Sequence, residues 1–378
     1  MNSNCLIIAG EKSGEDHCLS FFSDLKEECP GVNFWGVGGD EMTDLGFESL
    51  YQLKDFSSWG FSEVIAKIPF YFSALNKIVE TAVERNTKVA ILIDFQDFNL
   101  RLAKRLSKNG IKVLYYVAPQ AWAWKPWRAK TLGEAVHTLF TIIPFEKNWF
   151  KERGVRNVVS VNHPLHYSMG PEFKKGPSKI FAELKDACHL LLLPGSRNFE
   201  VKNLLPEFIK VAAKLKNENP GLRLSIVKSP NVDEALYSPY LQLFEKIYPS
   251  DSLTNALEQA DFSLAASGTV TLATALYEVP TVVCYKSSLL NEFIFYTFLD
   301  YKGPISLANI VHDRIIYPEL IQDQATEYNI HQAILKWMTS EAEYIKIKKE
   351  LAKTKELIRG EGLEASQILA EVINQNSI

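Results

Sequence analysis

The segment that most constrains the fold of this chain is the leucine run Leu190–Leu193, which Pro-Gly-Ser-Arg follows directly at 194–197. The run is short and wholly apolar, which is typical of a strand buried on both faces of a parallel sheet. A second apolar run at 262–266 is followed by Ser-Gly-Thr at 267–269. We therefore predict two parallel strands that each lead through a turn of small residues into a helix.

Both turns are candidate phosphate-binding sites. Ligands of open α/β sheets bind beyond the carboxyl ends of the strands, where helix N-termini present free N–H groups and a positive dipole end. Arg197 adds a forked guanidinium group that suits phosphate oxygens. The predicted ligand contacts are Gly195, Ser196, Arg197, Ser267, Gly268 and Thr269. The alternative is that both are ordinary strand-to-helix turns and that Arg197 is a solvated surface charge.

Short apolar runs separated by helical stretches extend along most of the chain and predict an α/β protein with two doubly wound parallel sheets. The predicted strands are 6–9, 34–37, 89–93, 113–117, 139–143 and 158–161, then 190–193, 222–227, 262–265 and 281–285. A stretch rich in Pro, Gly and Lys at 162–177 is the predicted domain boundary. We predict domains at 1–168 and 169–345, a helical tail at 346–378 that packs back on the first domain, and a ligand cleft between the two sheets.

Composition excludes several classes of protein. The net charge of −4 argues against a nucleic-acid-binding protein. The five cysteines contain no C-x-x-C pair, which predicts a reducing compartment without disulfides or a zinc site. The first residues lack the basic region of a signal peptide, and no apolar run reaches the roughly 18 residues of a membrane span. We expect a cytoplasmic protein. The aromatic-rich segment 56–75 either lies on a membrane surface or belongs to the core.

Asp94 is the candidate general base. It follows the apolar strand 89–93, where desolvation raises the pKa of a carboxyl group. The turn after the first strand carries Glu11, Ser13 and Gly14, and its acidic character suits sugar hydroxyls better than phosphates. In this turn Ser13 is the predicted helix cap. Asp97 is predicted to cap the next helix. For Asp94 and for the turn after the first strand, a structural role alone is the alternative.

Two further segments have open interpretations. Trp122, Trp124 and Trp127 follow another strand, where their rings either stack on a sugar or acyl chain or fill the core. His163 and His166 lack a carboxylate partner at metal-ligand spacing, and the chain has no Asp-x-Asp pair. We therefore predict neither a bound metal nor another cofactor.

The motifs, taken in order, resemble those of lipid-A-disaccharide synthases from Ile7 to about Gln322. They are Ala-Gly-Glu-x-Ser-Gly at 9–14, Ile-Asp-x-x-Asp-Phe-Asn at 93–99, Tyr-Val-Ala-Pro-x-x-Trp-Ala-Trp at 116–124, Pro-Phe-Glu-Lys at 144–147, His-Pro-Leu at 163–165, Leu-Pro-Gly-Ser-Arg at 193–197, Ala-Ser-Gly-Thr at 266–269 and Pro-Glu-Leu-x-Gln at 318–322. The resemblance implies a two-domain glycosyltransferase-B fold and an inverting, metal-independent transfer. It implies Asp94 as base, Arg197 and Asn309 as donor contacts, and Glu11, Ser13 and Gly14 near the acceptor.

The implied substrates are a UDP-linked diacylglucosamine donor and a diacylglucosamine 1-phosphate acceptor, joined β-1,6. The implied partner surface is the inner face of the cytoplasmic membrane, and the resemblance leaves open whether the chain forms a homodimer. The chain departs from the family at Glu15, at Asn162 and most seriously at Ala273, where a glutamate is expected to bind the ribose. Thr274 and Glu278 are the candidate substitutes. Alternative functions are another UDP-sugar enzyme of this fold, such as a 2-epimerase, a pyrophosphate-splitting hydrolase, or a non-catalytic lipid- or nucleotide-binding protein.

Overall fold

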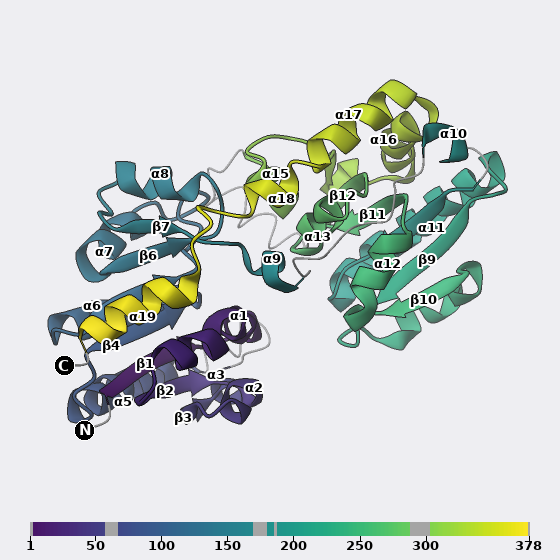
Figure 1. The fold of residues 1–378 in the computed structure, drawn as a ribbon. Helices are drawn as coiled ribbons and strands as arrows, with labels where there is room; N and C mark the ends of the chain where they lie inside the picture. The colour runs from purple at the N-terminus through teal and green to yellow at the C-terminus, as the bar shows by residue number, and fades with distance from the viewer. Residues whose placement is uncertain (1–2, 57–66, 169–179, 185–186, 288–302, 377–378) are drawn as a thin grey trace. The chain divides into compact units, whose positions relative to one another are not determined.

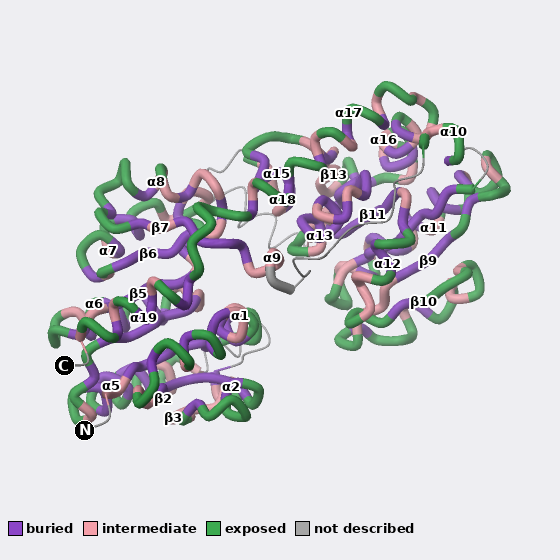
Figure 2. Tube along the Cα trace, in the orientation of Figure 1, coloured by how far each residue is buried: buried purple, intermediate pink, exposed green. Residues whose placement is uncertain are grey.

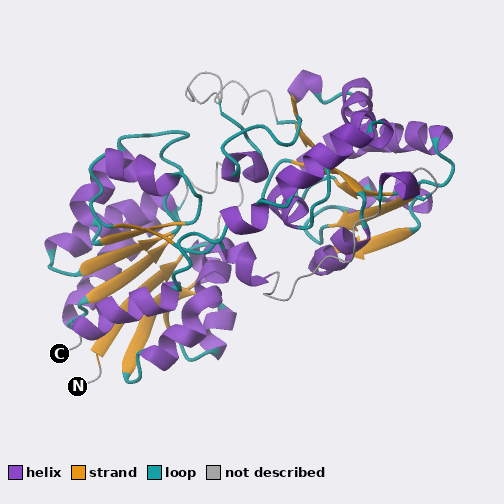
Figure 3. Cartoon of the chain, turned by 45° about the horizontal axis from the view of Figure 1, so that its top comes forward, coloured by secondary structure: helices purple, strands orange, loops and turns teal. Residues whose placement is uncertain are grey.

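A computed structural model describes residues 3–56, 67–168, 180–184, 187–287 and 303–376 of the chain. The chain forms two compact units, Met1–Ser168 with Ile358–Ile378, and Met169–Leu357 (Figure 1). Each unit is a sheet of parallel strands with helices on both of its faces (Figure 3). The predicted fold class is confirmed.

The first unit contains a seven-stranded sheet in the order β3-β2-β1-β4-β5-β6-β7. Its strands are β1 (Ser3–Ala9), β2 (Val32–Gly38), β3 (Glu48–Gln52), β4 (Val89–Ile93), β5 (Lys112–Tyr116), β6 (Thr138–Thr141) and β7 (Val158–Ser160). Its helices are α1 (Lys12–Glu28), α2 (Asp40–Asp44), α3 (Leu53–Phe56), α5 (Ile68–Glu84), α6 (Gln96–Lys108), α7 (Arg128–Ala135), α8 (Glu146–Glu152), α9 (Pro164–Ser168) and α19 (Ala365–Gln375).

Both faces of this sheet are buried, which explains why its strands are continuous apolar runs. On β1, Leu6 and Ile8 belong to one hydrophobic cluster and Cys5, Ile7 and Ala9 to another. The first cluster includes side chains of α5, α6 and α7, and the second includes those of α1 and α19. The strands accordingly lie among the buried segments (Figure 2). Alternating side chains therefore serve two cores, as expected of a doubly wound sheet.

The chain returns to the first unit at its C-terminal end. Helix α19 lies beside α1 (Figure 1), and its Leu369 and Ile373 share a cluster with Phe22 and Leu25. The return occurs at Ile358, later than the predicted residue 346. Helix α17 (Glu341–Leu351) stays with the second unit because its Tyr344, Ile347 and Leu351 are buried in that unit's core.

The second unit contains a six-stranded parallel sheet in the order β10-β9-β8-β11-β12-β13. Its strands are β8 (His189–Leu193), β9 (Arg223–Lys228), β10 (Lys246–Pro249), β11 (Phe262–Ala266), β12 (Thr281–Tyr285) and β13 (Glu319–Ile321). Its other α-helices are α10 (Phe181–Leu184), α11 (Asn198–Glu218), α12 (Leu253–Gln259), α13 (Val270–Leu276), α15 (Leu307–Val311), α16 (Glu327–Thr339) and α18 (Thr354–Leu357). Four short 3₁₀ helices are η1 (Glu234–Leu236), η2 (Ser238–Leu243), η3 (Ser250–Ser252) and η4 (Gln322–Gln324). As in the first unit, Leu190 and Leu192 face one cluster and Leu191 and Leu193 face the other.

The ten predicted strands all form, and three further strands escaped prediction. These are β3, β10 and β13, which lie at sheet edges; their side chains are mostly exposed or half-buried, so they lack a long apolar run. Strand β5 ends at Tyr116, because Val117 adopts a left-handed conformation with φ of 65°. Segment 57–66 of the aromatic-rich stretch and most of the predicted domain boundary, at 169–179, lie outside the described residues. Among the helices that the structure describes, none has the length and apolarity to cross a membrane.

Candidate active site

The sequence-predicted turns lie where strand order reverses in each sheet. In the first unit, β1 and β4 are neighbours, and they lead into the turn at Gly10 and into Asp94. In the second unit, β8 and β11 are neighbours, and they lead into 194–197 and 267–269. Ligands of doubly wound sheets bind at such switch points. The fold therefore gives each unit one candidate ligand-binding edge.

Asp94 lies at the end of β4 in an unusual backbone conformation. Its N–H continues the sheet by donating to the Tyr116 carbonyl at 3.0 Å. Asp94 and Phe95 then both adopt left-handed conformations, with φ of 46° and 44°. Such a conformation costs a non-glycine residue roughly 1–3 kcal/mol, and it is frequent at functional sites. The surrounding contacts must therefore hold this loop in place.

The carboxyl group of Asp94 has a raised pKa of about 6. Burial is the main cause, and the negative charge of Glu11 adds to it, while the Phe95 N–H lowers the pKa in part. Burial also raises the pKa of Glu11 itself. A carboxyl group with a pKa near 6 is ionised at neutral pH yet is a stronger base than an ordinary aspartate. Asp94 and Glu11 thus lie close enough to interact at the switch point of the first sheet.

The turn that contains Glu11, Ser13 and Gly14 begins α1 in a different way from the prediction. Glu11 is the N-cap residue and Ser13 lies inside the first turn, so Ser13 does not cap the helix. Gly14 is buried, and a Cβ there would meet the backbone of Ala9 at 3.5 Å and the carbonyl of Ile93 at 3.6 Å. The turn consequently packs closely against the ends of β1 and β4.

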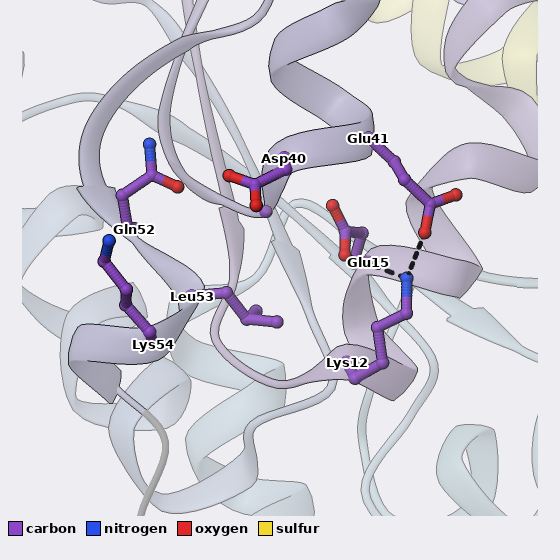
Figure 4. Close-up of a pocket in the computed structure, with 8 residues that line it drawn as sticks. Lys12, Glu15, Asp40, Glu41, Gln52, Leu53 and Lys54 are labelled. Carbon is purple, nitrogen blue, oxygen red and sulfur yellow. Dashed lines mark hydrogen bonds and ion pairs between the residues drawn. The ribbon is translucent and has the colours of Figure 1, made fainter.

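A charged pocket lies beside this turn, with a volume of about 320 Å³ (Figure 4). The Lys12 ammonium group pairs with the carboxylates of Glu15 at 3.0 Å and Glu41 at 2.6 Å. Glu15 is buried and fills the space that a Cβ at Gly39 would need. The remaining lining residues are Asp40, Gln52, Leu53 and Lys54. Carboxylates outnumber lysines here, so the pocket suits hydroxyl groups better than phosphate.

The tryptophan segment is anchored at two points. The Trp122 indole N–H donates to Glu146 at 2.9 Å, and burial raises the pKa of this carboxyl group to about 7. The buried Arg128 pairs with Asp97 at 2.6 Å and also donates to Gln96. Asp97 lies in the first turn of α6, whose N-cap residue is Phe95, so the prediction that Asp97 caps this helix is wrong.

The rings of Trp124 and Trp127 are not part of the core. Both are exposed, Trp127 at 65%, and the Trp124 ring lies under the Lys125 ammonium and Arg128 guanidinium groups. Their packing as core residues is therefore excluded. His163, in contrast, is buried, and its Nδ1 accepts the Leu165 N–H at 3.1 Å. Burial and the neighbouring His17 lower the pKa of His163 to about 3, as expected of a structural histidine.

In the second unit, Gly195 and Arg197 both contact Glu200. Gly195 has a φ of 116°, and a Cβ there would lie 2.4 Å from the Glu200 carboxylate. This carboxylate accepts the Ser196 N–H at 3.0 Å and pairs with Arg197 at 2.9 Å. Helix α11 begins at Asn198, with Arg197 as its N-cap residue. Sequence reasoning missed Glu200, although a glutamate at the third helical position commonly reaches back to the start of its helix.

Arg197 remains available to a ligand. Its side chain is 80% exposed, although it pairs with the Glu200 carboxylate at 2.9 Å. On the neighbouring strand, Ser267 donates from its hydroxyl to the Ile305 carbonyl at 3.1 Å, while open space surrounds the Cβ position of Gly268. Thr269 is the residue before α13. This edge of the sheet therefore offers a diphosphate one exposed guanidinium group and one turn that is sterically open.

Asn309, a predicted donor contact, has its side-chain amide hydrogen-bonded within the protein. It is fully buried, and its Nδ2 donates to the Tyr317 carbonyl and to Glu319, while its Oδ1 accepts the N–H groups of Ile316 and Tyr317. These four bonds use the whole capacity of an amide side chain. Glu319 in turn accepts the N–H groups of Ile305 and Ser306. Asn309 therefore organises the loop that contacts Ser267.

Residue 273, where a ribose-binding glutamate is expected, is an alanine in this chain. Ala273 is buried in an apolar cluster with Leu191 and Tyr277. Of the two candidate substitutes, Thr274 is buried with its hydroxyl bonded to the Thr271 carbonyl, and Glu278 is partly exposed and pairs with Lys348 at 3.2 Å. Within the described ranges, no cluster of three or more His, Cys, Asp or Glu side chains could hold a metal ion.

Solved structures with a similar fold identify the class of protein. The UDP-GlcNAc 2-epimerase from Neisseria meningitidis bound to UDP-GlcNAc covers 99% of this chain with a TM-score of 0.59 and 11% identity, over 100% of its own length. MurG from Acinetobacter baumannii covers 99% with a TM-score of 0.58 and 13% identity, over 99% of its own length. The two parallel-sheet units and their switch-point turns thus define a protein of the glycosyltransferase-B fold.

Sequence relatives identify the family. A family model described as lipid-A-disaccharide synthetase matches residues 5–373. The lipid-A-disaccharide synthase of Nitrosococcus oceani is 34% identical, with 86% of this chain and 84% of that protein covered. That of Myxococcus xanthus is 33% identical, with 87% and 86% covered. The chain belongs to the lipid-A-disaccharide synthase family and is therefore a glycosyltransferase. This membership decides against the 2-epimerase alternative, which shares only the fold.

Proposed function

We propose that the protein joins a UDP-linked 2,3-diacylglucosamine to 2,3-diacylglucosamine 1-phosphate through a β-1,6 bond and releases UDP. The observation that carries this proposal is Asp94, a carboxylate with a pKa of about 6 at the switch point of the first sheet. Family membership supplies the class of substrate, and the Asp94 environment supplies a base of suitable strength for a sugar hydroxyl.

In the proposed reaction, Asp94 removes the proton from the 6-hydroxyl group of the acceptor. The acceptor oxygen then attacks the anomeric carbon of the donor on the face opposite UDP. The new carbon–oxygen bond forms as the bond to the β-phosphate oxygen breaks, through a transition state with oxocarbenium character. The proton ends on Asp94, and the electron pair of the broken bond leaves with UDP. The configuration at the anomeric carbon is inverted.

Negative charge accumulates on the departing diphosphate, and we propose that Arg197 stabilises it. A guanidinium group offers a fork of N–H donors that matches phosphate oxygens. The N–H groups of the open turn at Gly268 and Thr269 are proposed to add further donors. A diphosphate has to compete with Glu200 for Arg197, so donor binding exchanges one anion for another at this side chain. The ligand cleft between the two sheets, in which both units would contact the donor and the acceptor, stays a prediction.

The acceptor sugar is proposed to bind at the edge that carries Glu11, Ser13 and Gly14, where the neighbouring pocket offers carboxylates to hydroxyl groups. On the donor side, Ala273 cannot hydrogen-bond a ribose diol. We infer that the uridine contact in this chain comes from backbone groups or from other side chains than in typical members of the family.

One assay tests the proposed reaction. The purified protein is incubated with UDP-diacylglucosamine and diacylglucosamine 1-phosphate in EDTA, the products are identified by mass, and UDP release is measured. We expect a disaccharide 1-phosphate and UDP in equal amounts, because the proposed charge stabilisation uses side chains and N–H groups rather than a metal ion. Release of UDP without disaccharide, or an isomerised donor sugar, would contradict the proposal and favour a hydrolase or an epimerase.

We also propose that the exposed side of α5 meets the membrane that holds both substrates. Phe72 is 53% exposed on α5, next to the half-exposed Ile68, and the Arg101 guanidinium group lies 5.6 Å from the Phe72 ring centre. Phe70, by contrast, is partly buried and packs against the core residue Phe56, so we do not include it in this surface. Apolar side chains with a neighbouring cation suit a surface of anionic lipids.

Replacing Ile68 and Phe72 together by serine is expected to weaken binding to phosphatidylethanolamine–phosphatidylglycerol vesicles by about tenfold or more. Withdrawing a large apolar side chain from water contributes roughly 1.5–3 kcal/mol when burial is complete, and two are removed. Co-sedimentation measures the effect. The matched control replaces Ile315 and Tyr328, which are also exposed, by serine. Equal vesicle binding by the α5 variant and the wild type would refute this surface.

A further inference from the structure

We propose that Tyr115 and Asn99 are positioning residues that hold the main-chain carbonyl of Asp94 and thereby aim its carboxylate. This inference rests on the proposed role of Asp94 as the base. Two side chains from different elements converge on one oxygen. The Tyr115 hydroxyl, from β5, donates to the Asp94 carbonyl at 2.9 Å, and the Asn99 amide, from α6, donates to the same oxygen at 2.9 Å.

The carbonyl needs such partners because of the backbone that carries it. Asp94 and Phe95 are consecutive non-glycine residues in the left-handed region, a conformation that an L-residue leaves unless other contacts retain it. The Asn99 amide also donates to the Ile93 carbonyl at 3.1 Å, so one side chain joins the last strand residue to the turn. The turn conformation is therefore fixed from the strand side and from the helix side.

Both side chains are well suited to keep their hydrogen bonds to the Asp94 carbonyl at all times. Tyr115 and Asn99 are fully buried, so water does not compete for their hydrogen bonds. Burial raises the pKa of the Tyr115 hydroxyl, and it therefore stays protonated and remains a donor at any pH at which the protein works. Their target is a backbone atom rather than the carboxylate. Neither donor therefore neutralises the base, and their effect on it is orientation.

The next residue, Phe95, is held independently. Its ring lies against Gly10, where a Cβ would come within 2.6 Å of the ring, and it packs with Phe56 and Phe98. Removing one donor to the Asp94 carbonyl thus leaves the aromatic packing in place. We expect a loosened turn in a folded protein, which changes the direction of the carboxylate without changing either substrate-binding surface.

The test is Tyr115→Phe, which removes one hydroxyl group and keeps the ring. We expect kcat to fall about tenfold or more, since a displacement of the base on the order of 1 Å is enough for such a loss. The KM values for donor and acceptor are expected to stay within about twofold of the wild type. Tyr237→Phe is the matched control, because Tyr237 is equally buried and its hydroxyl accepts a single N–H, from Ser229, in the second unit. The control is expected to lose stability only.

A double-variant cycle separates positioning from a general structural role. In the Asp94→Asn background, Tyr115→Phe is expected to cause no further loss of turnover, because it acts only through the Asp94 carboxylate. A wild-type kcat in Tyr115→Phe, or an undiminished loss in the Asp94→Asn background, would overturn the positioning role and leave Asp94 as base intact. A wild-type kcat in Asp94→Asn would overturn both. If Tyr115→Phe does not fold, Asn99→Ala removes the other donor and decides by the same criteria.

Discussion

Asp94→Asn is expected to lower kcat by at least about 10²-fold, toward the 10⁴-fold that a positioned general base can contribute. Asparagine has nearly the same shape but cannot accept the acceptor's proton. Donor affinity is expected to be unchanged, because the proposed donor contacts lie in the second unit. The measurement is kcat and both KM values, with Asp24→Asn, an exposed substitution on α1, as the control. Near-normal turnover would refute Asp94 and direct attention to Asp97 or Glu11.

The wild-type pH profile checks the same assignment. The pKa of Asp94 is raised to about 6, and the base works only when it has lost its proton. Turnover is therefore expected to be level above about pH 7 and to fall roughly tenfold per unit below about pH 5. A low-pH limb near pH 4 instead would point to a solvated carboxylate as the base.

Stability gives an independent control for the Asp94 variant. A carboxyl group whose pKa is higher in the folded protein than in the unfolded chain favours folding in its protonated form, and this contribution is lost as the pH rises through about 6. At pH 8 the ionised Asp94 is thus an unfavourable buried charge. Asp94→Asn is therefore expected to melt at the same or a higher temperature at pH 8, so that its loss of turnover cannot be attributed to unfolding.

Arg197→Ala is expected to weaken UDP binding about 10- to 100-fold, because a hydrogen bond to a charged group contributes roughly 1.5–3 kcal/mol. Uridine, which lacks phosphates, is expected to lose little affinity. Titration calorimetry of UDP and uridine on the same variant makes the comparison. Arg223→Ala is the matched control, since Arg223 is also an exposed arginine of the second unit paired with a glutamate, Glu245. Equal losses for UDP and uridine would mean that Arg197 supports the turn rather than binding phosphate.

Several features of this protein follow from the sequence alone. The apolar runs predict ten strands because a strand buried on both faces has no polar positions, and this property needs no knowledge of neighbours. The position of Asp94 after such a run predicts both its burial and the direction of its pKa shift. The turns at 195–197 and 267–269 can also be predicted from the sequence, because the local backbone geometry of a tight strand-to-helix turn favours small residues. The ordered motifs also identify the family.

The tertiary structure decides which side chains become partners. Glu200 pairs with Arg197, Arg128 pairs with Asp97, and the Asn309 amide donates to the Tyr317 carbonyl and to Glu319. Phe70 and Phe72 are two residues apart, and the packing of α5 against the core makes the Phe70 ring partly buried and leaves the Phe72 ring exposed. The pair of donors on the Asp94 carbonyl comes from β5 and α6. Such contacts depend on how segments that are distant in the sequence pack against one another, and a local pattern of residues does not determine this packing.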